Sequence, residues 1–283
     1  MKMNFYYPLL VILLTITVIT GCNQATKTAS GNNISWDSIH VDKTYHMLED
    51  TNNPSCNLKV DFVFPAGLED QEVLKAVQRQ FINSCMGESY KSLAPAEAVD
   101  RYVEDYLAEY KKLEKDFLAE KEHDHDEPGG SWFSYYESFS DNITYNGNNL
   151  LCYGIDYEKY TGGAHGSHSS QSYLIDMQTG LVVTESELFT EGFQEELANI
   201  IVGKIVEKNK AKDAKELEDM GFFSVDEIYP NNNFSVDDAG ITYHFNEYEI
   251  AAYVVGPTKV FIPYGEIKHL LRADSKIAPL AAH

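Results

Sequence analysis

Basic side chains are scarce in this chain of 283 residues, which has 22 Lys and Arg against 44 Asp and Glu and a formal net charge of −22. Nucleic-acid binding depends on neutralising phosphates with Lys and Arg, so this balance argues against a nucleic-acid partner. It also argues against a basic face that would hold anionic lipid. A surplus of carboxylates keeps a protein soluble and attracts cationic partners. Solubility alone and attraction of a cationic partner both stay open at this point.

Motifs for metal binding and hydrolysis are also missing. The sequence has no Cys-x-x-Cys pair, which argues against a thiolate zinc site, and no Gly-x-Ser-x-Gly, which argues against a nucleophile-elbow hydrolase. His165 and His168 could be two metal ligands, and His123 and His125 could add more, but one pair lies in a loop and the other at a charged helix end, so a rigid zinc site is not favoured. We expect His165 to hydrogen-bond inside its own loop. Asp and Glu are so abundant that no glycosidase pair can be singled out. The sequence therefore identifies no catalytic residue, metal or cofactor, and favours a binding protein over an enzyme.

The sequence has one long apolar run, over residues 5–19, and no later run is long enough to span a membrane. This run follows a lysine and precedes a small residue and Cys22, the arrangement of a signal peptide. It resembles a bacterial lipoprotein signal, in which cleavage leaves Cys22 as the lipid-carrying first residue. An ordinary signal peptide with Cys22 as a bystander is the alternative. We predict a signal peptide over 1–21 and a flexible tether over 22–38, where apolar residues are few.

Cysteine is scarce as well, with four residues in all. A compartment outside the cytoplasm permits disulfides. Cys56 opens a predicted strand and Cys85 closes the helix that follows it, so we predict a Cys56–Cys85 disulfide. Cys152 would then be a buried thiol that packs as a small apolar residue. Three cysteines cannot all pair, and the sequence alone does not fix which two do.

In the first half of the chain, the spacing of apolar residues changes from the alternation of a strand to the spacing of a helix. Apolar residues alternate with polar ones in two segments and then recur at helical spacing, ending in a long seam from Pro95 to Phe117. The predicted elements lie at 39–47, 56–64, 73–85 and 95–117. A Pro-Gly-Gly stop follows at residues 128–130. These signals predict an N-terminal α+β region over 39–128.

Strand signals dominate the second half. Asn146-Gly147 is the strongest short hairpin signal, and it joins two alternating apolar runs. Thr184 and Glu187 have the spacing of a capping box, which predicts the start of a helix. The main predicted elements lie at 131–145, 149–160, 193–205, 234–245, 260–262 and 263–271. The sum is an α+β protein with antiparallel sheets, packed helices and two strand-and-helix blocks, the second over 131–272.

A glycine-rich loop, Tyr-Thr-Gly-Gly-Ala-His-Gly over residues 160–166, joins the two central strands. Three glycines within five residues allow backbone conformations that are closed to other residues, so we expect a loop of defined shape. Many of the 19 tyrosines crowd the neighbouring strands. Rings with a polar tip suit the binding of sugars or protein surfaces, and they equally suit a core whose rings end at water. The candidate binding residues are Tyr160, Gly162, Gly163, His165 and Gly166.

Several ordered motifs of the second half resemble the RsiV-like domain family of bacterial cell-envelope proteins. They are Tyr160–Gly166, Asp176 with Thr179-Gly180, Leu188-Phe189, Phe245–Tyr253, Gly256 and Val260–Tyr264. This family supplies the outer domain of anti-sigma factors that bind lysozyme, and it is found attached to peptidoglycan deacetylase domains. The chain shows neither an anti-sigma segment nor a deacetylase domain. The resemblance therefore implies a fold and an envelope setting rather than an activity.

The resemblance and the signal peptide together predict a lipid-anchored binding protein of the cell envelope. The residues after Cys22 lack the acidic run of some surface-exported lipoproteins, which favours the periplasmic side. The expected partner is a cationic, lysozyme-like protein. The alternative is a peptidoglycan-binding or peptidoglycan-modifying accessory module. A purely structural role is not separable from these at the level of sequence.

Overall fold

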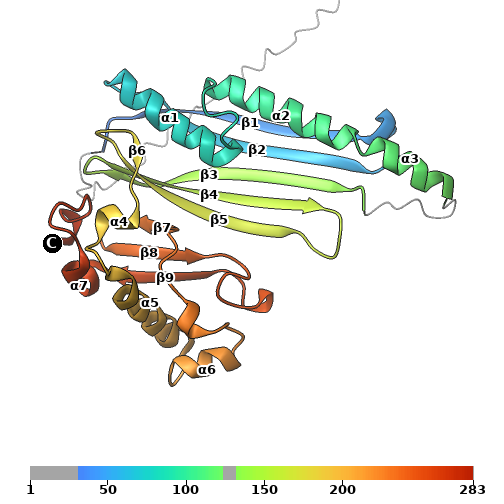
Figure 1. Ribbon diagram of the computed structural model, residues 1–283. Helices are drawn as coiled ribbons and strands as arrows, with labels where there is room; N and C mark the ends of the chain where they lie inside the picture. The colour runs from blue at the N-terminus through green and yellow to red at the C-terminus, as the bar shows by residue number, and fades with distance from the viewer. Residues whose placement is uncertain (1–30, 124–131, 283) are drawn as a thin grey trace, which may run out of the picture.

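The computed structural model describes residues 31–123 and 132–282, and it contains two β-sheets with helices packed against them (Figure 1). The larger sheet has six strands in the order β1-β2-β3-β4-β5-β6, and the smaller sheet is antiparallel with the order β7-β8-β9. The strands are β1 (Ser35–His46), β2 (Ser55–Gly67), β3 (Tyr135–Gly147), β4 (Leu150–Thr161), β5 (Ser167–Asp176), β6 (Leu181–Val182), β7 (Phe234–Val236), β8 (Gly240–Phe245) and β9 (Thr258–Pro263). The predicted α+β class is confirmed.

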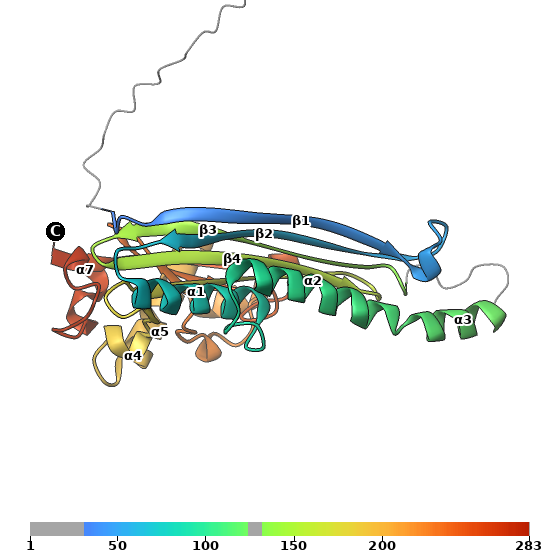
Figure 2. The same cartoon turned by 90° about the horizontal axis from the view of Figure 1, so that it is seen from above.

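The helices fall into two groups. The first group lies along one face of the larger sheet, where α1 and α2 contact β2 (Figures 1 and 2). The second group accompanies the smaller sheet, where α5 packs on β9. The α-helices are α1 (Gln71–Met86), α2 (Pro95–Lys111), α3 (Glu114–His123), α4 (Glu185–Leu188), α5 (Phe193–Asn209), α6 (Ala214–Asp219) and α7 (Tyr264–Ile267), and the short 3-10 turns are η1 (Met47–Glu49), η2 (Val225–Glu227), η3 (Tyr253–Val255), η4 (Lys268–Leu270) and η5 (Leu280–Ala282).

Alternation along β4 divides the core between the two faces of the larger sheet. Leu151 and Tyr153 point to the helix side, where the Phe81 ring of α1 stacks on Tyr153 with centroids 3.9 Å apart. Leu150 and Cys152 point the other way and pack with the smaller sheet and α5. Because successive strand side chains face opposite sides, one strand can serve both cores. β4 is therefore the central strand of the molecule.

The fold begins earlier than the sequence predicted. β1 starts at Ser35, within the segment 22–38 that we expected to be a tether. Asn32 is also held, since its Nδ2 donates to Asn146 Oδ1 at 2.8 Å and to the Leu150 carbonyl at 2.7 Å. The prediction of a flexible tether is thus wrong for the last residues of 22–38, because they contact the β3–β4 hairpin and then form the edge strand of the sheet.

The predicted signal peptide over 1–21 and the predicted lipid-attachment residue Cys22 lie outside the described residues. Within residues 31–123 and 132–282, no helix combines the length and apolar character needed to cross a membrane. The anchor therefore stays a prediction from the sequence.

A single sheet runs across the predicted border between the two blocks, 39–128 and 131–272. β2 and β3 pair in parallel, from Cys56 opposite Tyr135 to Asp61 opposite Ser140. Such pairing needs a long crossover connection, which α1, α2 and α3 provide. The two blocks thus share their larger sheet, and the border at 129–130 does not separate two sheets as expected.

The turn between β3 and β4 shows why the hairpin signal was correct but displaced. The two residues outside the ladder are Asn148 and Asn149, with φ of 55° and 58°, while Gly147 still pairs with Leu150. Two-residue hairpin loops favour positive φ at both central positions, and asparagine tolerates that region. Asn146-Gly147 therefore marks the end of β3 rather than the turn itself.

The predicted long helix is divided into α2 and α3. Its seam remains apolar across the break, since Tyr110 and Phe117 are both buried. The connection tightens where Leu113 donates its N–H to the Tyr110 carbonyl, a 3-10 type bond, at 3.0 Å. The seam packs on this molecule's own sheet, with Tyr102, Val103 and Tyr106 among the residues against the helix-side core.

The predicted Cys56–Cys85 disulfide is wrong. Cys56, Cys85 and Cys152 are all free and buried. Cys56 belongs to a small cluster with Met47 and Tyr110, whereas Cys85 belongs to the core beneath α1, so the two thiols lie in different parts of the interior. Burial raises the pKa of the Cys56 thiol to about 11, which makes it a poor nucleophile.

Candidate functional site

The glycine loop between β4 and β5 has the defined shape that its sequence predicted. Gly162 has φ of +82°, and a Cβ added there would lie 2.7 Å from the Trp132 carbonyl oxygen. A Cβ added at Gly166 would lie 2.6 Å from the Tyr136 hydroxyl. Only glycine fits both close approaches without displacing a neighbour. Gly163, by contrast, has open space around it, with φ of +108°.

Side chains within the loop fix it further. The Tyr160 hydroxyl donates to the Gly163 carbonyl at 2.8 Å, and the Tyr160 ring stacks on Tyr136 with centroids 5.9 Å apart. His165 Nδ1 donates to the Gly166 carbonyl at 2.8 Å, as expected for a loop-stabilising histidine. The candidate loop residues therefore interact with one another and leave part of their surface exposed.

The loop lies beside the connection between β8 and β9, although some 80 residues separate them in sequence. The His165 ring stacks on Tyr253 with centroids 5.0 Å apart, and Tyr253 stacks on Tyr248 at 5.6 Å. Nearby, Asn246 Oδ1 accepts a hydrogen bond from the Ser170 N–H at 2.7 Å. The tertiary structure thus brings together two of the motifs that carried the family resemblance.

Asparagine side chains also hydrogen-bond to the backbone along the free edge of β5. β6 pairs only with Ile175 and Asp176, so within the described part of the chain the rest of the β5 edge lacks a strand partner. Asn233 Oδ1 accepts from the Ser172 N–H at 2.9 Å, and its Nδ2 donates to the Ser170 carbonyl at 2.8 Å. Side-chain amides replace a strand here, which holds the smaller sheet at a fixed place beside the loop.

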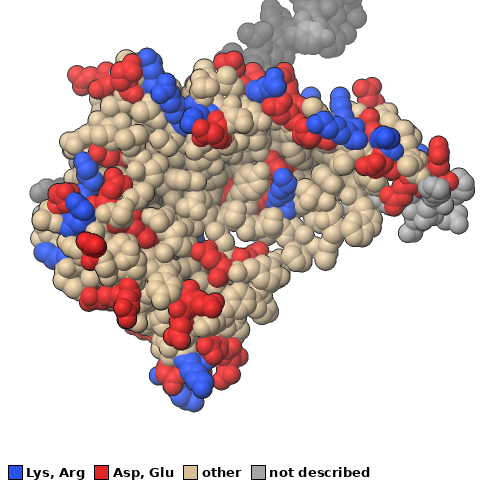
Figure 3. Space-filling model, viewed as in Figure 1, with Lys and Arg blue, Asp and Glu red and all other residues tan. Residues whose placement is uncertain are grey.

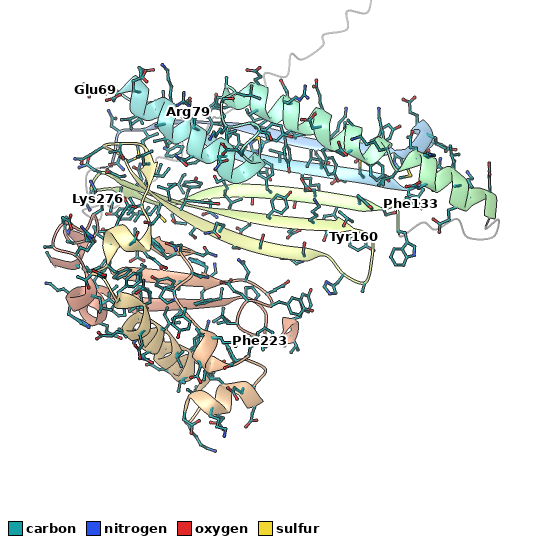
Figure 4. All side chains as sticks on the ribbon, in the orientation of Figure 1. Glu69, Arg79, Phe133, Tyr160, Phe223 and Lys276 are labelled. Atoms are coloured by element: carbon teal, nitrogen blue, oxygen red, sulfur yellow. The ribbon has the colours of Figure 1, made fainter. Side chains whose placement is uncertain are left out.

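Exposed apolar side chains surround this junction, and we call them the loop-end patch. Val254 is 89% exposed and Tyr248 55%. Phe223 joins them because its N–H donates to the Ile250 carbonyl at 2.9 Å, which places it next to the same connection. Tyr160 and Phe223, both labelled in Figure 4, mark the two sides of the region. The loop-end patch consists of His165, Phe223, Tyr248, Tyr253 and Val254.

The surroundings of the patch are acidic. Glu158 precedes the loop, and Glu247 and Glu249 lie on the β8–β9 connection. Figure 3 shows acidic side chains gathered over the lower half of the visible face, around the smaller sheet and its helices. An apolar centre with a charged rim is the usual composition of a binding surface.

The histidines of the described chain do not form a metal centre. His168 Nδ1 lies 3.5 Å from Glu158 Oε1 on the exposed surface, while His165 points to its own loop. No group of three or more His, Cys, Asp or Glu side chains within residues 31–123 and 132–282 is placed to hold a metal ion.

One serine and one histidine lie within hydrogen-bond distance, Ser235 Oγ and His244 Nε2 at 2.9 Å. Burial lowers the pKa of His244 to about 4, so the ring is neutral at pH 7 but is a weak base. His244 Nδ1 has no partner among the described residues, and a catalytic triad would need a carboxylate there. This pair therefore lacks the orienting acid of a hydrolase.

The sequence identified the loop but not the full patch. Tyr248 and Tyr253 belonged to a recognised motif without being assigned to a surface, and Val254 and Phe223 had no signal of their own. An exposed aromatic residue looks the same as a core residue in a sequence. Only the placement of the two segments shows that these side chains share one surface.

Two family models match the chain. The model described as deacetylase PdaC matches residues 49–168, and the model described as a protein of unknown function, DUF3298, matches residues 186–265. The first match is to a model named for a deacetylase, which was not expected from the sequence. The loop lies in the first matched region, and Tyr248 and Tyr253 lie in the second. The candidate site thus forms where the two matched regions meet. The pair of matches fits an accessory module of the cell envelope.

Solved structures similar to this chain include two of the DUF3298 family. One is a member of the DUF3298 family from Bacteroides fragilis, 32% identical with a TM-score of 0.84, and the match covers 90% of this chain and 99% of that one. The other is a DUF3298 family protein from Pseudomonas aeruginosa, 13% identical with a TM-score of 0.57, covering 86% and 98% of the two chains. The second likeness shows the fold alone. No curated protein matches the chain.

Proposed function

This chain belongs to the DUF3298 family, and on that premise we propose that it is an accessory binding module of the bacterial cell envelope. A lipid on Cys22 holds it at the membrane on the periplasmic side, and the loop-end patch contacts its ligand. The lipoprotein-type sequence before Cys22 and the two family matches support this setting.

The observation that carries the proposal is the exposure of Tyr248, Tyr253 and Val254 on one connection. The stacked rings hold this connection against the loop, so its shape is fixed while its apolar surface faces water. Moving apolar surface out of water is favourable by about 25 cal/mol for each Å² that is buried. Apolar side chains held in exposed positions are therefore ready to bury against a partner.

The acidic composition indicates the kind of partner. With a net charge of −22, the chain attracts cationic macromolecules and repels acidic ones. A cationic, lysozyme-like protein fits both features, since it can meet the acidic rim and bury the aromatic centre. Opposite charge raises the association rate, whereas the buried centre sets the dissociation rate.

The test is a titration of the full chain with lysozyme at low and at physiological salt. We expect saturable binding at both, weaker at the higher salt because screening reduces the charge contribution. Tyr253→Ala removes a central ring of the patch, and we expect it to weaken binding by about 30-fold, the range of an interface hot spot.

Leu181→Ser is the matched control, because Leu181 is also an exposed apolar residue but lies on β6, away from the loop. It should bind lysozyme like the parent chain. Equal weakening by both substitutions, or binding that disappears at physiological salt, would reduce the interaction to non-specific charge attraction and overturn the proposed partner.

Peptidoglycan is the second candidate ligand. The PdaC match over residues 49–168 favours it, because that model is named for a deacetylase and the family resemblance includes peptidoglycan deacetylases. The stacked rings of His165, Tyr253 and Tyr248 also suit sugar faces. Retention on purified sacculi that Tyr253→Ala abolishes, together with no lysozyme binding, would establish this alternative in place of the first.

A further inference from the structure

A concave site lies on the helix side of the larger sheet, and none of its lining residues belongs to the loop-end patch. It is a cavity of about 350 Å3 between α2 and the ends of β3 and β4. Phe133 and Tyr160, labelled in Figure 4, mark this end of the sheet. We call it the tyrosine pocket, and its lining includes Tyr102, Tyr106, Tyr110, Tyr135, Glu137 and Lys159.

The floor of the tyrosine pocket carries a buried carboxylate. Glu137 is only 4% exposed, and it pairs across the strands with Lys159, whose Nζ lies 3.1 Å from Glu137 Oε2. The other oxygen, Oε1, accepts a hydrogen bond from the Tyr102 hydroxyl. Tyr102 in turn lies 3.2 Å, oxygen to oxygen, from the Tyr157 hydroxyl. Burial raises the pKa of Tyr102 and the neighbouring Glu137 adds to the rise, so this phenol stays protonated as a donor.

A buried carboxylate is costly unless a cation or several donors compensate it. Here the compensating cation is an ammonium group at the end of a flexible stem, and the Lys159 side chain is still 45% exposed. Its only ion pair in the described structure is with Glu137. The Lys159 ammonium group can therefore move into solvent at small cost in free energy when another cation pairs with the Glu137 carboxylate.

The walls of the pocket suit a cation as well. Tyr106, Tyr110 and Tyr135 gather there, with the Tyr110 and Tyr135 centroids 5.5 Å apart in an edge-to-face arrangement. Aromatic faces attract ammonium groups through their negative quadrupole. Asp105 and Glu109 also line the pocket but are already paired with Arg101 and Lys112 at the exposed surface, so Glu137 is the charge that recognises the ligand.

The geometry points to the tyrosine pocket as a binding site for an alkylammonium group, which replaces Lys159 on Glu137 and lies against the tyrosine rings. A lysine side chain of a partner protein and a free amine share this chemistry. The inference does not rest on the loop-end patch, because no residue is common to the two sites.

The test is isothermal titration calorimetry of the full chain with pentan-1-ammonium and with lysine blocked at both termini. Pentan-1-ol and blocked norleucine are the neutral controls of matched length. We expect saturable binding of both amines and no measurable binding of the neutral molecules. If pentan-1-ammonium binds but blocked lysine does not, the pocket is a site for small amines. If both bind, the pocket can also take the lysine side chain of a partner protein.

Two variants locate the binding. Glu137→Gln keeps an acceptor for Tyr102 but removes the charge, and we expect it to weaken amine binding by at least about tenfold. Lys159→Met keeps the apolar stem but removes the resident ammonium, and we expect about tenfold tighter binding because nothing competes for Glu137. Tyr253→Ala in the loop-end patch should leave amine affinity unchanged, which separates this site from the one proposed above.

Four results would overturn the inference. The first three are equal binding of amines and neutral controls, no binding of either amine by the parent chain, and amine binding that is insensitive to Glu137→Gln. The fourth is stronger binding of N-acetylglucosamine than of glucosamine, since it would show a pocket for neutral sugars. If Lys159→Met does not fold, the Glu137→Gln comparison still decides the question.

Discussion

Asp141 lies where β2 and β3 separate, and its surroundings predict how stability depends on pH. Its side chain is 7% exposed, and Oδ1 accepts a hydrogen bond from the Val63 N–H at 2.7 Å. The other oxygen is buried without a partner in the described structure. Burial raises the pKa of Asp141 to about 7, and Asp61 nearby adds to the rise.

The sign of the effect follows from proton binding. The carboxyl titrates at 3.8 when unfolded and at about 7 when folded, so between these values the folded state binds more protons. Stability therefore falls as pH rises from about 4 to about 7 and is flat above that range. A rise from 3.8 to about 7 corresponds to at most about 4 kcal/mol of unfolding free energy.

Asp141→Asn removes the ionisation but keeps an acceptor for Val63. We expect the variant to match the parent near pH 4 and to exceed it at pH 8, by up to about 4 kcal/mol. Urea unfolding followed by tryptophan fluorescence at pH 4, 6 and 8 measures the difference. Asp100→Asn, an exposed carboxyl on α2, is the control and should differ little from the parent at every pH.

A stability difference between Asp141→Asn and the parent that does not change with pH would refute the reasoning. It would show that the Asp141 carboxylate is solvated or compensated in the folded state. A variant less stable than the parent at pH 8 would show that the charge itself is needed where β2 and β3 diverge.

Three further outcomes are expected. Phe81→Ala should cost about 3–5 kcal/mol of unfolding free energy in denaturant melts, because it removes a fully buried ring stacked on Tyr153; a loss below 1 kcal/mol would contradict this packing. Gly162→Ala should destabilise by about 2 kcal/mol and more than Gly163→Ala, since both have positive φ but only Gly162 also meets backbone atoms; equal melting temperatures of the two variants would count against it. Dithiothreitol should leave the melting temperature unchanged and thiol reagents should label the three described cysteines only on unfolding, because all are free and buried; a drop in melting temperature on reduction would reveal a disulfide.

Local signals in the sequence were reliable at several positions where neighbouring residues decide the structure. The capping box at Thr184 and Glu187 forms as predicted, with the Thr184 N–H donating to Glu187 Oε2 at 2.8 Å. The helix predicted from Phe193 to Ile205 is present as α5. Both features depend on contacts within a few residues, which a sequence displays directly.

Glu137 shows a signal that was present but not used. Tyr135, Glu137 and Phe139 alternate along β3, which places a carboxylate in a row of inward-facing aromatic residues. That pattern could have marked Glu137 as a buried charge in need of a partner. Its partner Lys159 lies directly opposite on β4, and only the strand register identifies it.

Short-range patterns in the sequence predicted the α+β class, most strands and helices, and a glycine loop of defined shape, because hydrophobic period, caps and glycine conformations act over short distances. Tertiary structure alone decided the parallel pairing of β2 with β3, the separation of Cys56 from Cys85, and the contact of His165 with Tyr253. These depend on segments far apart in the chain, whose association is set by the shared burial of whole faces. No residue pattern within either segment encodes which distant surface it will meet.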